Sequence, residues 1–425
     1  MPFAWKGTVL YSLSPTDLQV YKDAYVVCDS GICQGVFSKL PPCYEHIPVH
    51  DFGNALILPG MSDLHLHAPQ YAFRGVWMDQ EVVDWLNTYT FPHESKYSDL
   101  QYAERAYRIF AEDLKNSLTT RACIFGTIHS ESTRLLMELL DKTGIKTFAG
   151  RVSTDRNAPD CLIEESAAAS YKSSLNFLNS TLSAYKNCKP ILTPRCTFFC
   201  SDQMMEDTRR LMLEYGLPLQ SHLSENPRRL KQLKKLYPNE TCDGEAYDRF
   251  GLFGTDCPVV MAHCVHSPEQ EINLMAKPNL YVAHCPESNL NLSSGIAPVR
   301  RIMSAGIKTG LGSDIAAGAR LSMLYIMGLA IQVSKMYWRY VDTQCAPLTV
   351  EEVFYMATLG GGGFFGQVGS FIPGYDFDAV ALSDDAIRSP IEFTPKERLE
   401  RMLYLHENAR LLAKCVAGQE IPLSI

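Results

Sequence analysis

Two histidines, His65 and His67, stand two residues apart at the end of the apolar run ILPGMSDLHLH. Residues two apart on a β-strand point to the same side of the sheet, so both imidazoles are expected to face inwards. Imidazole nitrogen is a common zinc ligand, and two imidazoles on one strand are a good beginning for a metal site. Taken alone, the same pair is also compatible with a polar turn.

Four more polar residues end apolar runs in the same manner. His222 ends LPLQSH, His263 ends VVMAH, His284 ends YVAH and Asp314 ends GLGSD. Five of the eleven histidines and one aspartate therefore occupy equivalent positions. If these runs are parallel strands of one barrel, their carboxyl ends meet at one face. The sequence thus predicts a site of imidazole and carboxylate ligands at that face.

Glu225 follows His222 by three residues, just beyond the predicted strand. A carboxylate there could reach both an activated water and the substrate, as a proton shuttle requires. Three neutral imidazoles and one carboxylate leave a position for water, whose pKa falls towards about 7 on zinc. His263 is surplus to four ligands, and we expect it to orient the water or hold Asp314, helping to deprotonate the water.

One metal ion per chain is favoured over two. A two-metal site would usually need a bridging group, such as a modified lysine, on a middle strand. The fourth apolar run, PILTPRC, offers Arg195 at this point and no lysine. We therefore expect one Zn²⁺ per chain.

The elements that must position these residues form a repeating pattern. Short apolar runs alternate with longer amphipathic stretches such as SDLQYAERAYRIFAEDLKN, which is typical of parallel α/β folds. Eight such runs predict a closed (β/α)8 TIM barrel. An open, doubly wound sheet is the alternative, but it would gather ligands at one crevice rather than at several strand ends. The runs lie within residues 54–67, 119–129, 146–155, 189–195, 217–225, 257–264, 279–286 and 307–314.

The two ends of the chain differ from this pattern. Short alternating runs broken by Gly and Pro, including GTVLYSL and FDAVALS, occur before and after the barrel region. We expect them to pair into one small composite β-sandwich. The predicted organisation is therefore residues 1–58 and 366–425 as the two parts of the sandwich, with residues 59–365 as the catalytic barrel.

Composition excludes several classes of protein. The net charge of −8 argues against nucleic acid as a partner, which would need a basic face. No run approaches the roughly 20 apolar residues that span a bilayer, and the N-terminus lacks the features of a secretory signal. The fourteen cysteines are irregularly spaced and include no CxxC pair. We expect a cytoplasmic protein with reduced thiols and no membrane partner.

Longer motifs carry a resemblance to a known family. The segments PGMSDLHLHAPQ, QSHLSEN, MAHC, AHCPESNLNLSSG and GLGSD resemble, in this order, the cyclic-deaminase branch of the amidohydrolase superfamily. HLHAPQYAFRG, WLNTYTFPHE, TTRACIFGTIH, LTPRCTFFCSD and ATLGGGGFFG are similar to the guanine deaminases of that branch. The resemblance covers nearly the whole chain. It implies a homodimer with mononuclear zinc that converts guanine and water to xanthine and ammonia.

The resemblance also assigns residues. It makes His65, His67, His222 and Asp314 the zinc ligands and Glu225 the proton shuttle. His222, Asp314 and Glu225 are also expected to contact the substrate. Gln70 corresponds to the glutamine that reads the purine edge, and Arg195 to the arginine that holds the 6-oxo group. Cys196 departs from the family, which commonly has phenylalanine there. An aromatic ring would pack on the base, so Cys196 removes stacking area that Phe198 or Phe199 would have to supply.

Two other functions remain open at this point. The first is a related aminohydrolase acting on an adenosine-type nucleoside, cytosine, an oxidised guanine or a triazine, because only the pocket would distinguish these. The second is a scaffold protein that kept the fold and lost catalysis. Such proteins typically show substituted metal ligands, whereas this chain has the full set.

Overall fold

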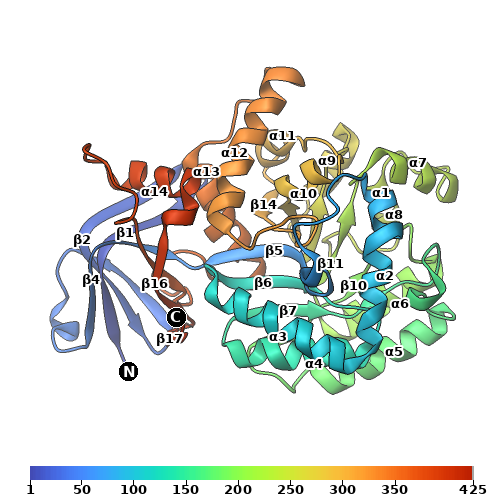
Figure 1. Ribbon diagram of the computed structural model, residues 1–425, viewed down its shortest axis with the longest axis horizontal. Coiled ribbons are helices and arrows are strands. Elements are labelled where there is room, and N and C mark those ends of the chain that lie inside the picture. The colour runs from blue at the N-terminus through green and yellow to red at the C-terminus, as the bar shows by residue number, and fades with distance from the viewer. Residues whose placement is uncertain (424–425) are drawn as a thin grey trace.

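The computed structural model describes residues 1–423, and its centre is a set of parallel strands wrapped by helices (Figure 1). Two four-stranded sheets have the orders β5-β6-β7-β9 and β11-β12-β13-β14, and all their pairs are parallel. The strands are β5 (Met61–His67), β6 (Thr119–Phe125), β7 (Lys146–Gly150), β9 (Cys188–Pro190), β11 (Leu219–Leu223), β12 (Val259–His263), β13 (Leu280–His284) and β14 (Lys308–Leu311).

These strands correspond to the eight apolar runs of the sequence. The pair β8 (Val152–Ser153) and β10 (Thr193–Pro194) extends the runs of β7 and β9. A parallel bridge from Leu192 to Leu219 joins the two sheets on one side. On the other side the Asp314 N–H donates to the His65 carbonyl oxygen at 2.8 Å. The fold is thus α/β with parallel sheets.

Helices cover the outside of the strands (Figure 1). The helices are α1 (Val82–Trp85), α2 (Phe91–Glu94), α3 (Leu100–Asn116), α4 (Ser130–Thr143), α5 (Ala167–Thr181), α6 (Asp202–Tyr215), α7 (Pro227–Leu236), α8 (Asp243–Arg249), α9 (Glu269–Met275), α10 (Pro286–Asn291), α11 (Val299–Ser304), α12 (Met323–Tyr340), α13 (Val350–Tyr355) and α14 (Pro395–Tyr404). No helix among the described residues is both long and apolar enough to cross a membrane.

Local sequence explains where the longer helices begin and end. The Asp99 carboxylate accepts from the Gln101 N–H at the start of α3, and the Ser201 hydroxyl accepts from the Met204 N–H at the start of α6. Helix α6 ends at Gly216, whose φ of 62° is the left-handed conformation that glycine adopts without strain. Along α3 the residues Tyr107, Ala111 and Leu114 recur at helical spacing and are buried in the hydrophobic core.

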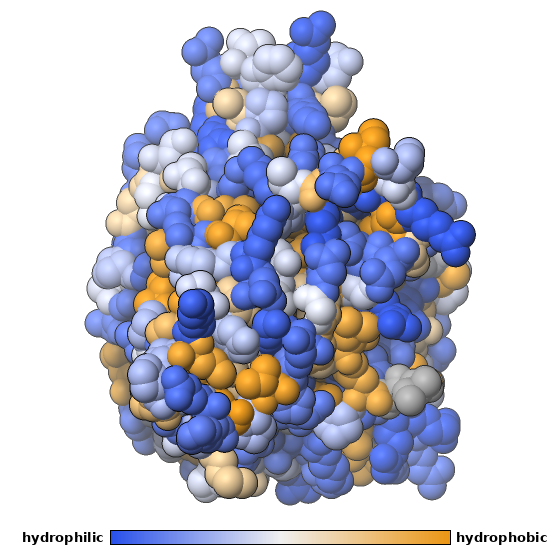
Figure 2. All heavy atoms as spheres, turned by 90° about the vertical axis from the view of Figure 1, so that its left-hand side faces the viewer, coloured by the Kyte–Doolittle hydropathy of each residue, from blue (hydrophilic) through white to orange (hydrophobic). Residues whose placement is uncertain are grey.

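Both ends of the chain contribute to one seven-stranded sheet, at the left of Figure 1. Its order is β17-β16-β15-β4-β1-β2-β3, and β4 pairs with β15 antiparallel. Figure 2 shows this side of the molecule, where hydrophobic side chains lie in separate patches among hydrophilic ones. The strands are β1 (Phe3–Ser14), β2 (Asp17–Asp29), β3 (Ile32–Phe37), β4 (Val49–Pro59), β15 (Ala379–Ser383), β16 (Arg410–Val416) and β17 (Gln419–Glu420). A sandwich of two facing sheets stays a prediction.

Buried polar contacts join this sheet to the parallel strands. Arg121 of β6 donates from Nε to the Asp378 carboxylate at 2.6 Å, and both side chains are buried. Lys414 of β16 is 0% exposed, and its Nζ donates to the carbonyl oxygens of Lys115, in the last turn of α3, and of Ser117, directly after the helix. The two hydrogen bonds from Lys414 satisfy carbonyl groups that the end of a helix leaves without partners.

Lys414 is expected to make stability depend on pH. Burial lowers the pKa of its ammonium from 10.5 to about 7, and Asp378 opposes this only in part. Between pH 7 and 10.5 the unfolded chain therefore binds more protons than the folded chain, so the free energy of unfolding rises with pH. In Lys414→Met this contribution is absent. The rise of the free energy of unfolding with pH should then be shallower by up to about 1.4 kcal/mol per pH unit.

Equilibrium urea unfolding between pH 7 and 9.5 measures this difference. Lys142→Met is the matched control, because the Lys142 side chain is 63% exposed and its slope should equal that of the unmodified chain. Parallel slopes for Lys414→Met and the unmodified chain would contradict the prediction.

Candidate active site

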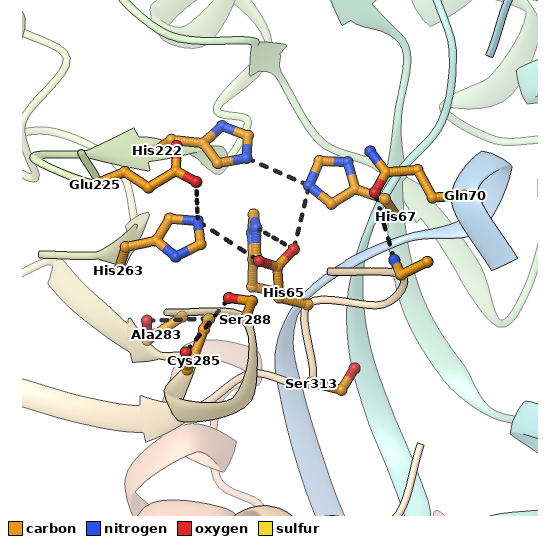
Figure 3. Close-up of polar contacts among 12 residues, drawn as sticks. His65, His67, Gln70, His222, Glu225, His263, Ala283, Cys285, Ser288 and Ser313 are labelled. Atoms are coloured by element: carbon orange, nitrogen blue, oxygen red, sulfur yellow. Dashed lines mark hydrogen bonds and ion pairs between the residues drawn. The ribbon is translucent and has the colours of Figure 1, made fainter. Parts of the chain in front are cut away.

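His65 and His67 lie at the end of β5, and both imidazoles are buried (Figure 3). The segment after β14 holds this strand in place. The Asp63 carboxylate accepts from the N–H groups of His65 and Ser313, and the His67 N–H donates to the Ile315 carbonyl oxygen at 2.8 Å. Asp314 is thereby held directly beside the two histidines.

The structure brings the four predicted metal ligands together. Asp314 Oδ1 lies 3.3 Å from His65 Nε2 and 3.6 Å from His67 Nε2. The Nε2 atoms of His67 and His222 are 3.3 Å apart. The ligand atoms form two overlapping groups of three, and within each group they lie within 4.8 Å of one another. One group is His65, His67 and His222, and the other is His65, His263 and Asp314.

The protonation states suit metal binding. Burial lowers the pKa of His65, and it lowers the pKa values of His67 and His222 to well below 6.5, so the imidazoles are neutral. His222 Nδ1 donates to the Arg195 carbonyl oxygen at 2.7 Å, which leaves the Nε2 lone pair facing the cluster. Burial opposes ionisation of Asp314, but its contact with the His65 imidazole favours the carboxylate and lowers the pKa of Asp314 to about 2; a neutral ring acts here as a hydrogen-bond donor and not as a charge.

This donor set fits a divalent cation. His65 Nε2 is buried and makes no well-aligned hydrogen bond among the described residues, although Asp314 Oδ1 lies 3.3 Å away. The facing Nε2 atoms of His67 and His222 would repel through their lone pairs unless a proton or a cation lay between them. Three neutral imidazoles with one carboxylate are ligands that zinc accepts at sites where one position stays open for water.

A phenylalanine, not predicted as part of the site, packs on the histidines. The Phe125 ring lies 5.0 Å from the His65 ring, 4.5 Å from the His67 ring and 4.9 Å from the His222 ring, centre to centre. It is fully buried at the end of β6. Its position at the end of an apolar run is the same signal that identified the histidines, but an apolar residue there does not suggest chemistry.

Glu225 and His263 face each other beside the cluster (Figure 3). Glu225 Oε1 lies 4.0 Å from His263 Nε2, which in turn lies 3.8 Å from Asp314 Oδ2. The other ring nitrogen of His263, Nδ1, is 3.0 Å from Asn289 Oδ1. A short shift, or one bridging water, would connect Glu225, His263 and Asp314 in a proton-transfer chain.

The backbone is strained around these residues. His263 (φ 76°), Asp314 (φ 47°) and Ser224 (φ 44°) adopt the left-handed conformation although none is glycine. Such conformations cost about 1–3 kcal/mol each and persist where the surrounding structure enforces them, commonly at functional sites.

His284 lies outside both groups of candidate ligands. It ends β13 as expected, but neither ring nitrogen has a hydrogen-bond partner among the described residues. Burial lowers its pKa to about 4, so the ring is neutral. Of the five histidines that end strands, His284 is thus the one without a place in the cluster.

A pocket opens over the cluster. Gln70, in the 3-10 turn η2 (Ala68–Phe73), and Arg195, just after β10, line it together with the buried Cys196. Phe199 also lines the pocket, whereas Phe198 does not. The tract WLNTYTFP, resembling the family, contributes to the wall through Trp85 and Leu86.

Glu94, which was not among the residues predicted from the sequence, links the two predicted substrate-binding residues. Its Oε1 accepts from Gln70 Nε2 at 2.8 Å and its Oε2 accepts from Arg195 Nη1 at 2.9 Å. Glu94 ends α2 within the tract WLNTYTFPHE. No spacing pattern sets this glutamate apart from other helical glutamates, so only the fold shows the connection.

Parallel α/β sheets with a histidine and aspartate cluster at the strand ends define the class of protein. The sequence model of the amidohydrolase family matches residues 56–405, and the chain belongs to this family. Its relatives include guanine deaminase from Dictyostelium discoideum, 33% identical over 98% of this chain and 97% of the relative. Guanine deaminase from Escherichia coli strain K12 is 35% identical over 80% of this chain and 76% of its own length.

A solved structure agrees with these relatives. Guanine deaminase from C. acetobutylicum, crystallised with guanine bound in its active site, is 41% identical and has a TM-score of 0.95. The match covers 99% of this chain and all of the other.

Proposed function

We infer that this chain hydrolyses guanine to xanthine and ammonia, a reaction at a C–N bond of a cyclic amidine. One observation carries the inference: the cluster of His65, His67, His222 and Asp314 lies beneath a pocket lined by Gln70 and Arg195. The named activity of the relatives, similar over most of their length, supports the same reaction. The chain thus serves purine catabolism or salvage.

Zinc, one ion per chain, is the metal that we propose for the cluster. His65, His67, His222 and Asp314 would hold it, because their ligand atoms converge and their protonation states suit a cation. When bound, zinc supplies Lewis acidity that lowers the pKa of water towards neutrality. The neutral imidazoles preserve this acidity, since they add no negative charge.

Glu225, His263 and Asp314 would move the protons. Asp314 and His263 accept a proton from the attacking water, which adds to the amine-bearing carbon of guanine. Glu225 protonates the neighbouring ring nitrogen, so negative charge does not build up on the ring. The proton taken up by Asp314 and His263 then passes to the exocyclic nitrogen, and ammonia leaves as the C–N bond breaks and the new hydroxyl group returns a proton to Glu225. The approach of Glu225 to His263 within 4.0 Å supports this division of roles.

Gln70 and Arg195 would recognise the base. An amide offers both a donor and an acceptor, and a guanidinium offers only donors, which matches the edge of an oxo-purine. Cys196 leaves one face of the pocket without the family's aromatic ring. Phe199 and the guanidinium of Arg229, whose Cζ lies 4.6 Å from the Phe199 ring centre, line the pocket nearby and would supply contact area instead.

A comparison of substrates tests the function. We expect loss of guanine absorbance with matching appearance of xanthine, and little turnover of adenosine or cytosine. Removal of metal by a chelator should abolish the activity, and added Zn²⁺ should restore it. Stable guanine absorbance with zinc-loaded protein would contradict the function, and preferred turnover of adenosine or cytosine would favour a related aminohydrolase.

The finer architecture is also part of the proposal. The bridge from Leu192 to Leu219 and the bond from Asp314 to His65 support closure of the eight strands into a TIM barrel over residues 59–365. Residues 1–58 and 366–425 would form the composite β-sandwich, with positions 424 and 425 of this range lying outside the described residues. We further propose a cytoplasmic homodimer, which sedimentation velocity and cell fractionation would test.

A further inference from the structure

Glu94 is a buried carboxylate, 4% exposed, with both oxygens committed to residues of the pocket. It is not itself in the pocket lining, so it acts through Gln70 and Arg195. We propose that Glu94 is a positioning residue that sets the substrate preference for a 6-oxo purine. The proposal rests on the proposed function, because it concerns how that site reads its base.

The carboxylate fixes which way the Gln70 amide points. An ionised carboxylate only accepts hydrogen bonds, so the amide must turn its NH₂ group towards Glu94. The Gln70 oxygen then faces the Ala316 N–H, at 3.4 Å. One amide hydrogen and one oxygen lone pair remain for a ligand, in a fixed order along the pocket wall. Without Glu94 the two orientations of the amide would be closer in energy.

The same carboxylate holds the Arg195 guanidinium. Arg195 is 7% exposed, and burial of an unpaired charge is costly, so its ion pair with Glu94 is needed to keep it in the pocket wall. The guanidinium also lies over the Phe91 ring, 4.9 Å from its centre. Its remaining N–H groups can donate to an acceptor such as the 6-oxo oxygen. A 6-amino group would instead place N–H donors opposite these N–H donors, and no hydrogen bond would form.

The test compares two bases that differ in the group Arg195 would read. Guanine and 2-aminopurine carry the reacting amine on the same carbon, but 2-aminopurine lacks the 6-oxo group. In Glu94→Gln we expect KM for guanine to rise about tenfold or more, which is the effect of losing a hydrogen bond to a charged group. The effect on kcat should be smaller. The preference for guanine over 2-aminopurine should fall by a similar factor.

Inhibition constants make the test independent of turnover. Where 2-aminopurine reacts too slowly to follow, its competitive inhibition constant against guanine replaces KM in the comparison. Glu94→Asp, which keeps the charge but withdraws it by one methylene, serves as the second variant if Glu94→Gln does not fold. Because the shorter aspartate side chain cannot reach both partners, the preference should fall in that variant as well.

Glu352→Gln is the matched control. Glu352 is also a buried glutamate that pairs with an arginine, at 2.7 Å from Arg300, but it lies outside the pocket. Its replacement should lower the melting temperature without changing the preference between the two bases. An unchanged preference in Glu94→Gln, or an equal loss for both bases, would overturn the proposal. Absence of guanine turnover in the unmodified chain would instead refute the proposed function.

Discussion

Replacing Glu225 with glutamine is expected to lower kcat for guanine by about 10²–10⁴-fold, the range typical of general acid–base catalysis. Glutamine has nearly the same shape, but it can neither release nor take up a proton at neutral pH. The side chain is not among the candidate metal ligands, so zinc content and folding should not change. Steady-state kinetics together with metal analysis on the same preparation measure both quantities.

Glu245→Gln is a suitable control for this variant. Glu245 lies in α8 and bonds to Thr241 at the surface, away from the pocket lining. Its replacement should leave kcat unchanged. If Glu225→Gln retained more than about a tenth of the activity, a different group would have to carry the proton.

Removing the His222 imidazole should lower the activity at least as much as Glu225→Gln, because it weakens metal binding. His222 Nε2 faces His67 Nε2 at 3.3 Å, so His222→Ala deletes one of three converging imidazoles. Residues that only orient a metal ligand alter affinity by about 10–100-fold, and loss of a ligand itself should exceed that. Zinc titration should show weaker binding by more than about 100-fold, with activity lost at micromolar zinc.

His284→Ala provides the comparison. His284 is also a buried histidine at a strand end, but it belongs to neither group of candidate ligands. Both variants create a cavity, so both should be less stable, yet only His222→Ala should lose zinc. Added zinc should raise the melting temperature of metal-free His284→Ala and not that of His222→Ala. Equal zinc affinity in the two variants would remove His222 from the ligand set.

The strands and the cluster were predictable because both follow from local rules. Each buried parallel strand is a nearly continuous apolar run, and polar residues at its end are conspicuous against that background. His222, His263 and Asp314 were found in this way although they lie far from His65 in the sequence. Parallel strands place all such ends at one face, so the fold class predicts that these residues gather there, but it does not separate His284 from the candidate ligands.

Contacts between side chains from unrelated elements were not predictable. Glu94 is separated from Gln70 by 24 residues and from Arg195 by 101. No periodic pattern connects three such positions, and a glutamate at the end of a short helix resembles many surface residues. Phe125 was missed for the opposite reason, since an apolar residue at a strand end does not stand out by type. The resemblance to the family predicted that Cys196 replaces an aromatic ring, but the position of Phe199 in the pocket lining required the structure.

The pairing of β4 with β15 has a consequence for synthesis of the chain. Pro59 pairs with Ala379, which the ribosome adds about 320 residues later. At ~5–20 residues per second the nascent chain spends roughly 15–60 s with the β4 edge lacking its final neighbour. Exposed strand edges are templates for association with other chains. The seven-stranded sheet can therefore form only after β15 has been synthesised, and until then the β4 edge remains open to pairing with other chains.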